Sequence, residues 1–163
     1  MAQVITTIIS GAQTGGDQGG LEAAKRLGLI TGGLIPKGFR TDNGPKPEFA
    51  EMYGIEEDSS SSYPPRTEKN VLRGTGTVIV GDLNSTGCKL TKSLCIRHNR
   101  PWLHIYWDSK TPFTSLEQSL FRGFILSNRI LVLNVAGNRE SKNPGLQKAV
   151  SDFIYGSLKD IIS

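Results

Sequence analysis

Five short apolar segments rich in β-branched residues recur along the chain, and most of them are nearly continuous rather than alternating with polar positions. Continuous apolar runs of this length are typical of strands that are buried on both faces of a parallel sheet. The predicted strands cover residues 4–10, 33–36, 77–81, 102–107 and 129–135.

Helical patterns separate these strands. One of them begins with Thr114-x-x-Glu117, the signature of a capping box, and places Leu116, Leu120 and Phe121 on one stripe. The alternation predicts an α/β fold, a single-domain, Rossmann-like doubly wound parallel sheet of about five strands over residues 1–163. The predicted helices cover residues 17–27, 67–73, 87–99 and 114–128, and a last helix begins at Asn143-Pro144.

Residues 37–65 interrupt the alternation. The segment contains four prolines and the run Ser59–Ser62, and it shows no strand or helix pattern. A stretch of this kind is typical of a functional loop or a disordered insert. We therefore predict a long loop excursion at about 37–65, whose path over the sheet edge would set the size of any site there.

Charge and composition narrow the classes of partner. The net charge is +4, and the basic excess lies in the second half of the chain. These cations suit a small anionic ligand, but they are too scattered for a nucleic-acid groove. No apolar segment is long enough to span a membrane, and no secretory signal pattern opens the chain. Cys88 and Cys95 are too far apart on one helix to form a disulfide. We expect a reduced, cytoplasmic protein.

Metal chemistry has little support in the sequence. Cys95 and His98 are three residues apart on a predicted helix and could touch one metal ion, but no second His/Cys pair lies nearby in sequence. We therefore predict no metal site.

The chain has 19 glycines, and many of them gather where a predicted strand ends and a helix begins. Three such junctions lie at residues 10–19, 81–87 and 134–141. The carboxyl ends of parallel strands share one edge of a sheet, and helix N-termini there bind anions. Each junction alone is explained by a turn with a helix cap, whereas three together favour a phosphate-binding cleft. The spacings match neither the dinucleotide fingerprint nor a P-loop, which excludes ATP hydrolysis of the P-loop kind.

These junctions supply the candidate ligand-binding residues. Backbone and hydroxyl groups of the glycine-rich loops would form a cradle, and nearby cations would neutralise a phosphate. Asp17 is also explained by its place in the first turn of a helix, where a carboxylate stabilises the dipole. The full candidate set is Gly11, Gln13, Thr14, Gly15, Asp17, Lys37, Arg66, Thr86, Gly87, Lys89, Gly137, Arg139 and Ser141.

Four motifs carry a resemblance to a known family. They are 9–17 (ISGAQTGGD), Pro36-Lys37-Gly38, 66–71 (RTEKNV), and 134–141 (NVAGNRES) followed by Pro144-Gly145. In this order they resemble the putative molybdenum carrier family, a circularly permuted branch of the SLOG Rossmann-like domains. The resemblance implies binding of molybdenum cofactor or a nucleotide, with no other cofactor indicated, and a homodimer or tetramer.

One departure bears on catalysis. Hydrolytic relatives carry a PGGxGTxxE motif with a catalytic glutamate, and they use an arginine from another helix. The matching segment here is 85–91, with Thr91 at the acidic position and Arg66 as the counterpart of the arginine. Threonine is a poor general acid. We therefore predict a binding, carrier or sensor protein for a small phosphate-containing, nucleotide-like or pterin-like ligand.

Two alternatives stay open. The first is a nucleoside-monophosphate phosphoribohydrolase, in which the catalytic candidates are Asp17, Arg66 and Glu140, with either carboxylate replacing the missing glutamate. The second is an interaction protein whose glycine-rich edge binds no small molecule. Binding and base-release assays with nucleotides separate the three classes.

Overall fold

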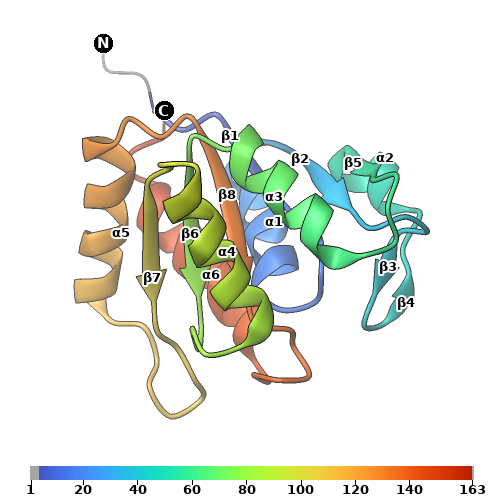
Figure 1. Cartoon of the computed structure of the whole chain (residues 1–163). Helices are drawn as coiled ribbons and strands as arrows, with labels where there is room; N and C mark the ends of the chain where they lie inside the picture. Colours follow the sequence, from blue (N-terminus) through green and yellow to red (C-terminus); the bar gives the residue numbers. More distant parts are fainter. Residues whose placement is uncertain (1–3, 163) are drawn as a thin grey trace.

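The computed structural model describes residues 4–162 and contains a six-stranded parallel sheet with helices on both faces (Figure 1). The strand order is β5-β2-β1-β8-β6-β7. This confirms the predicted α/β, Rossmann-like doubly wound class, with one strand more than expected. The strands are β1 (Thr7–Ser10), β2 (Ile30–Ile35), β5 (Ile55–Glu57), β6 (Gly76–Val80), β7 (Trp102–Ile105) and β8 (Val132–Gly137).

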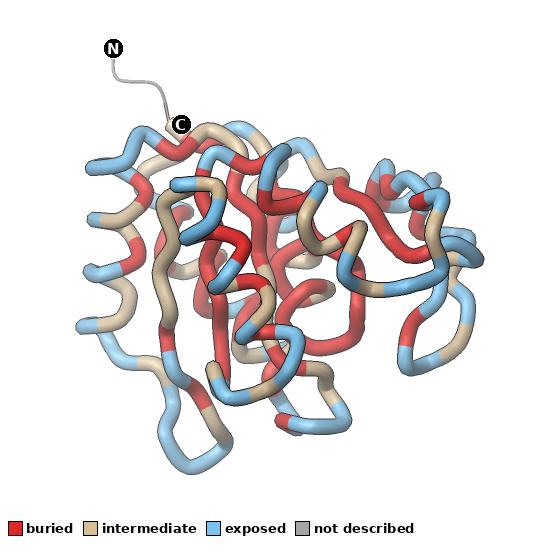
Figure 2. The backbone as a smooth tube through the Cα atoms, viewed as in Figure 1, coloured by how far each residue is buried: buried red, intermediate tan, exposed pale blue. Residues whose placement is uncertain are grey.

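The helices form one layer on each face. Helices α3 (Tyr63–Arg73) and α4 (Thr86–Arg97) lie side by side in front of the sheet in Figure 1. The other layer contains α1 (Gly16–Leu27), α5 (Ser115–Ser127) and α6 (Leu146–Leu158), which bury residues in one shared apolar cluster. Figure 2 shows buried central strands and helices that each turn an exposed face outward.

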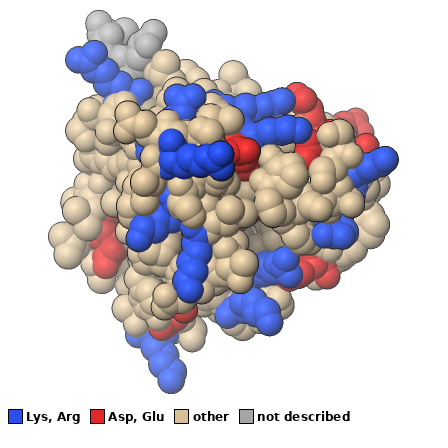
Figure 3. Space-filling view, in the orientation of Figure 1, with Lys and Arg blue, Asp and Glu red and all other residues tan. Residues whose placement is uncertain are grey.

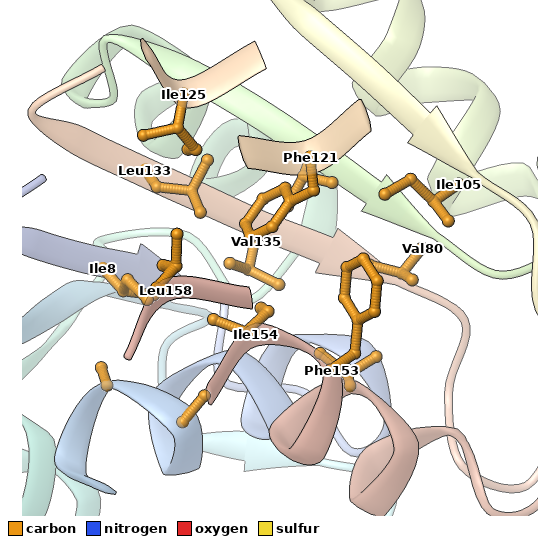
Figure 4. Packing of buried hydrophobic residues seen from close by; sticks show 14 of the residues in the cluster. Ile8, Val80, Ile105, Phe121, Ile125, Leu133, Val135, Phe153, Ile154 and Leu158 are labelled. Carbon is orange, nitrogen blue, oxygen red and sulfur yellow. The ribbon is translucent and has the colours of Figure 1, made fainter. Parts of the chain in front are cut away.

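The main core lies between the sheet and the second layer. Phe121 and Ile125 from α5 meet Phe153, Ile154 and Leu158 from α6 over the central strands (Figure 4). Their full burial fits a continuous apolar strand pattern, because each central strand needs cover on both faces. Burial of one such side chain contributes about 1.5–3 kcal/mol to folding.

The segment 37–65 is more ordered than its composition suggested. It contains a two-stranded hairpin, β3 (Arg40–Thr41) and β4 (Gly44–Pro45), followed by α2 (Phe49–Tyr53) and the edge strand β5. Phe49, Tyr53 and Ile55 pack in a small second cluster with Ile35 at the end of β2. These few apolar residues are enough to fix the segment against the sheet, although they show no regular period.

Two helices begin elsewhere than predicted. Helix α3 begins at Tyr63, and Pro64 and Pro65 lie in its first turn, where a missing N–H costs nothing. Helix α6 begins at Leu146 rather than at Asn143. The N-cap position is held by Gly145, and the Asn143 Nδ2 donates to the Trp107 carbonyl at 2.9 Å.

Helix α5 has the predicted capping box between Thr114 and Glu117. Its predicted buried stripe is partly wrong, because Leu116 is 65% exposed and Leu120 is 53% exposed while Phe121 is buried. The helix lies at the β7 edge of the sheet, so only one side of it meets the core (Figure 1). Within residues 4–162, no helix has the length and apolarity needed to cross a membrane.

The topology gives the sheet a switch point. Strands β8 and β6 are neighbours, but β8 leads to α6 on one face while β6 leads to α4 on the other. The loops after these two strands therefore diverge, and a crevice opens between them at the carboxyl edge.

Candidate functional site

A cavity of about 470 Å³ lies where the first turns of α3 and α4 face the carboxyl end of β8. This volume is within the range of about 300–1,000 Å³ that is typical of small-molecule sites. Among the predicted ligand residues, those that line the cavity are Gly11, Gln13, Asp17, Arg66, Thr86, Gly87, Gly137 and Arg139.

Arg66 and Asp17 form a buried ion pair in the wall of this cavity. The Arg66 Nη1 lies 3.4 Å from the Asp17 Oδ2, and the side chains are only 11% and 8% exposed. The Nε of Arg66 is also buried, and it has no hydrogen-bond partner within residues 4–162. A buried donor without an acceptor costs about 1–3 kcal/mol. The guanidinium is therefore only partly satisfied by the protein itself.

Asp17 is the carboxylate closest to this guanidinium. Its Oδ2 also accepts a hydrogen bond from the backbone N–H of Gln13 at 3.3 Å. Burial raises the pKa of the Asp17 carboxyl, and the positive charge of Arg66 opposes that rise. Asp17 is thus a buried group whose protonation depends on what else binds Arg66.

The N-terminus of α4 forms the opposite wall. Ser85 caps it by accepting from the Cys88 amide at 3.2 Å. The amides of the first-turn residues Thr86 and Gly87 have no intrahelical acceptor, and the helix dipole makes this end positive. The hydroxyl of Thr91 donates to the Gly87 carbonyl at 2.9 Å. Thr91, at the position of the relatives' glutamate, thus lines the cavity as a hydrogen-bonded hydroxyl.

Gly87 is a glycine that the protein's own packing does not require. A Cβ placed on it would meet no heavy atom within 4 Å among the described residues, and its φ is not positive. Glycine in a helix is destabilising by about 0.5–1 kcal/mol relative to alanine. Neither the packing nor the backbone conformation of the described residues therefore explains the glycine at this position.

Asn138 joins the two loops that diverge at the switch point. Its Oδ1 accepts from the Asp82 amide at 2.6 Å, and its Nδ2 donates to the Asp82 carbonyl at 2.9 Å. The same Nδ2 lies 3.2 Å from the Ser85 Oγ and 3.6 Å from the Cys88 Sγ.

Burial raises the pKa of the Cys88 thiol to about 11. The thiol is therefore protonated at neutral pH.

Several predicted ligand residues lie outside the cavity wall. Thr14 is buried, and its Oγ1 accepts from the Glu140 amide at 3.3 Å. Lys37 is exposed, and Lys89 lies in a shallow groove on the outer side of α4. Ser141 donates to Asp42 at 3.0 Å. The predicted residues outside the wall are Thr14, Gly15, Lys37, Lys89 and Ser141.

Close packing explains much of the glycine-rich pattern. A Cβ on Gly15 would come within 2.1 Å of the Asn138 carbonyl oxygen, and one on Gly137 would come within 2.6 Å of the Val80 oxygen. Here the first turn of α1 meets the backbone of β8 directly. These glycines therefore allow two protein segments to approach each other, which the sequence alone could not distinguish from ligand approach.

Glu140 is a helix cap in this structure rather than a cavity residue. Its two carboxylate oxygens accept from the amides of Gly145 at 2.7 Å and Gln147 at 2.9 Å, at the start of α6. Glu140 is not among the residues that line the cavity, and its role as a catalytic candidate stays a prediction.

Sequence reasoning missed several residues of the wall, among them Tyr63, Asn138 and Lys142. The signal for Tyr63 was present, since Pro64-Pro65 marks the first turn of a helix and places the preceding residue at its N-terminus. No local signal singled out Asn138, whose role depends on the neighbouring β6 loop. Within residues 4–162, no three His, Cys, Asp or Glu side chains are grouped closely enough to hold a metal ion.

The parallel sheet, its switch point and the cavity at its carboxyl edge define a protein of the Rossmann-like class. Residues 8–158 match the circularly permutated YpsA SLOG family, and the chain belongs to this family. This confirms the predicted resemblance.

One solved structure extends the comparison. The crystal structure of a putative molybdenum carrier protein from Syntrophus aciditrophicus SB has a TM-score of 0.84 to this chain, with 35% sequence identity. The similarity covers 93% of this chain and 95% of the Syntrophus chain. No curated protein matches the sequence.

Proposed function

We propose that this protein binds a small ligand with a phosphate group on a nucleotide-like or pterin-like body, and that it acts as a carrier or sensor. The observation that carries the proposal is the buried guanidinium of Arg66, whose Nε has no acceptor within the described residues although it borders a ligand-sized cavity. Phosphate oxygens supply the acceptors that such a donor needs.

The N-terminus of α4 is the proposed position of the phosphate. Its first-turn amides, the positive end of its dipole and the open surface over Gly87 all favour an anion there. Arg66 and Lys142 line the same cavity and add positive charge. Figure 3 shows that Lys and Arg outnumber Asp and Glu on the face formed by α3 and α4, which favours the approach of an anion.

The body of the ligand would lie along the less polar part of the wall. Leu90 from α4 and Val135 and Ala136 from β8 line the cavity beside Pro64 from α3. Apolar walls with a few polar groups at one end are typical of sites for flat heterocycles joined to a phosphate. The molybdenum carrier description of the Syntrophus protein supports a carrier role here.

Hydrolysis is the second candidate function, and Asp17 is the observation that favours it. This carboxyl lines the cavity, and burial raises its pKa toward the range that suits a general acid. Its hydrogen bond from the Gln13 amide and its pairing with Arg66 also explain it as a structural group. An assay for base release therefore belongs in the test.

The decisive experiment is native mass spectrometry of freshly purified protein, followed by binding and turnover assays. The panel consists of nucleoside mono- and diphosphates, cyclic ADP-ribose-type nucleotides and molybdenum cofactor. The proposal expects a co-purified mass or saturable binding to one of them, weakened by Arg66→Gln, without release of free base. Base release that Asp17→Asn abolishes would replace the carrier function by the hydrolase. A panel without any binding would favour the interaction protein.

Assembly and location are further proposals. Leu116, Leu120 and Leu126 leave an apolar, half-exposed side on α5, between the oppositely charged Glu117 and Arg122. Burial of these leucines against a second copy of α5 would remove apolar surface from water, so we propose a homodimer through this helix, in a cytoplasmic single-domain protein. Light scattering after gel filtration tests it, and Leu120→Lys should then produce monomers.

A further inference from the structure

The tip of the β3–β4 hairpin is attached to the glycine-rich loops by a single acidic residue. The Asp42 Oδ1 lies 3.1 Å from the Arg139 Nη1, and the Asp42 Oδ2 accepts from the Ser141 hydroxyl at 3.0 Å. The Asp42 amide donates to the Gln13 Oε1 at 2.8 Å. One carboxylate is thus held between a guanidinium and a hydroxyl, which is the arrangement that also binds a phosphate oxygen.

The surroundings of this carboxylate are strongly cationic. The guanidinium groups of Arg40, Arg66 and Arg139 lie 4.7, 5.4 and 5.1 Å from the centroid of the Tyr63 ring. Arg66 has Asp17 as its counter-ion and Arg139 has Asp42, whereas Arg40 has no ion-pair partner within residues 4–162. Three guanidinium groups therefore surround the half-buried Tyr63 ring, and within the described residues two of the three have a carboxylate as ion-pair partner.

This cluster borders the cavity. Tyr63, Arg66 and Arg139 belong to the cavity wall, while Asp42 and Ser141 lie just beyond it. Thr86 at the N-terminus of α4, Arg66 and Arg139 therefore line one cavity, and the Asp42 carboxylate is bound to the last of them. A ligand with a second anionic group would meet Arg139 there in competition with Asp42.

Displacing Asp42 from Arg139 should cost little free energy. Strands β3 and β4 pair over only two residues each, and the ion pair of Asp42 with Arg139 is partly exposed, at 23% and 41%. Partly exposed ion pairs contribute about 0–1 kcal/mol to stability. A ligand phosphate carries more charge than a carboxylate and has more acceptor oxygens, so it would bind the same donors more strongly.

We propose that Arg139, Ser141 and Arg40 form a second anion subsite, that Asp42 competes for it, and that the ligand therefore carries a diphosphate rather than a single phosphate. This inference rests on the proposed function, because it places the first phosphate at the N-terminus of α4. It commits the ligand to the class of diphosphate-bearing nucleotides or pterin nucleotides.

Site-resolved anion titrations test the subsite. Orthophosphate and pyrophosphate are titrated into the ¹⁵N-labelled full chain, and the amide shifts of Gly87 and Ser141 report the first and second subsites. In the wild type we expect pyrophosphate to shift both amides and to bind about tenfold more tightly than orthophosphate, because it adds charge-assisted hydrogen bonds.

Three variants separate the contributions. Asp42→Asn should tighten pyrophosphate binding about three- to tenfold, since it removes the competing charge while keeping the hairpin amide that binds Gln13. Arg139→Gln should remove the advantage of pyrophosphate over orthophosphate. Asp152→Asn is the matched control, because Asp152 is an exposed ion-pair partner of Arg26 and Lys148 on another part of the surface.

The outcomes distinguish a failure of the second subsite from a failure of the proposed function. Equal affinities for both anions, or an Asp42→Asn variant that binds pyrophosphate no better than Asp152→Asn does, would overturn the subsite. If the Gly87 amide still saturates in that case, the proposed function stands without it. If neither anion shifts either amide in any variant, both the subsite and the phosphate site of the proposed function are rejected.

Discussion

The guanidinium of Arg66 lies directly against the backbone of Gly11. A Cβ placed on Gly11 would come within 1.3 Å of the Arg66 Nη1 and within 2.4 Å of its Cζ. The φ of Gly11 is not positive, so the residue is glycine because of this contact and not because of its backbone conformation. Gly11, directly after β1, therefore has to be glycine as long as Arg66 on α3 keeps this position.

The first prediction concerns this contact. Gly11→Ala should displace the Arg66 guanidinium from Asp17 and weaken anion binding, and it should lower stability by about 1–3 kcal/mol because the buried Asp17 carboxylate loses its counter-ion. Urea unfolding and phosphate titration measure the two effects. Gly32→Ala is the control, since its new Cβ would make only ordinary contacts, with the Ile9 Cγ2 at 3.8 Å and the Gly54 carbonyl oxygen at 3.9 Å. Equal effects of the two substitutions would contradict the prediction.

The second prediction separates ligand approach from helix stability at Gly87. Gly87→Ala should raise stability by up to about 1 kcal/mol, because alanine is the better helix former. The same methyl group should weaken anion binding about tenfold or more by covering the first-turn amides. Gly123→Ala on α5 is a matched control, as its Cβ would also meet nothing within 4 Å among the described residues. If Gly87→Ala binds as well as Gly123→Ala, the anion does not lie on α4.

The third prediction concerns Asn138 as the link between the loops after β6 and β8. Asn138→Asp keeps the size of the side chain. It replaces the Nδ2 donor, which faces the Asp82 carbonyl and the Cys88 Sγ, by a buried oxygen that can only accept. We expect a loss of about 2–4 kcal/mol, since the second carboxylate oxygen would be buried against the Asp82 carbonyl oxygen. Thermal unfolding at neutral pH measures it. Asn128→Asp, which changes an exposed amide at the end of α5, should cost far less.

The fourth prediction tests the capping role of Glu140. Glu140→Ala should destabilise the protein by about 1–2 kcal/mol, because two amides at the start of α6 lose their acceptor. Ligand binding should stay within about twofold of wild type, a change of less than roughly 0.5 kcal/mol. The exposed Glu51→Ala serves as the control for stability. If Glu140→Ala lost base release but kept its stability, Glu140 would act as a catalytic residue and not as a cap.

The fifth prediction concerns pH. Burial raises the pKa of the Cys88 thiol to about 11 in the folded protein, above its value in the unfolded chain. The folded state therefore holds this proton more tightly, and the resulting stabilisation is complete below about pH 8.5 and is lost as the pH rises toward 11. Between pH 8 and pH 10.5 the wild type should lose about 2–3 kcal/mol more than Cys88→Ala does. Urea unfolding of both proteins at the two pH values checks this, and parallel losses would contradict it.

The sequence predicted the sheet well because its strands carry a strong local signal. The buried strands β1, β6 and β8 appear as continuous apolar runs, and Thr114-x-x-Glu117 fixed the start of α5. The strand β5 was missed because it has three residues and only Ile55 is buried in it. The wrong part of the α5 stripe has a different cause: Leu116 and Leu120 follow the helical period, but α5 lies at an edge of the sheet.

The candidate site was predicted in outline, as an edge of the sheet, more than in its residues. Strand ends and glycine-rich loops indicated the correct edge, and the motif order placed Arg66 in the wall. The reason for each glycine could not be predicted, because Gly15 faces the carbonyl oxygen of Asn138 in the loop after β8, while Gly87 faces open space. That difference depends on contacts between segments more than a hundred residues apart.

The central pairing of the sheet also has a kinetic consequence. Strand β8 lies between β1 and β6, and its register with β1 joins Thr7 to Val132. Contacts between such distant segments form against a large loss of chain entropy, so this pairing should limit the folding rate. During synthesis, the emerging chain can join β1, β2 and β5 on one side and β6 and β7 on the other, but the wall of the cavity is incomplete until β8 enters the gap. The cavity therefore forms only after β8 has been added, and a nascent or truncated chain without β8 would lack this part of its wall.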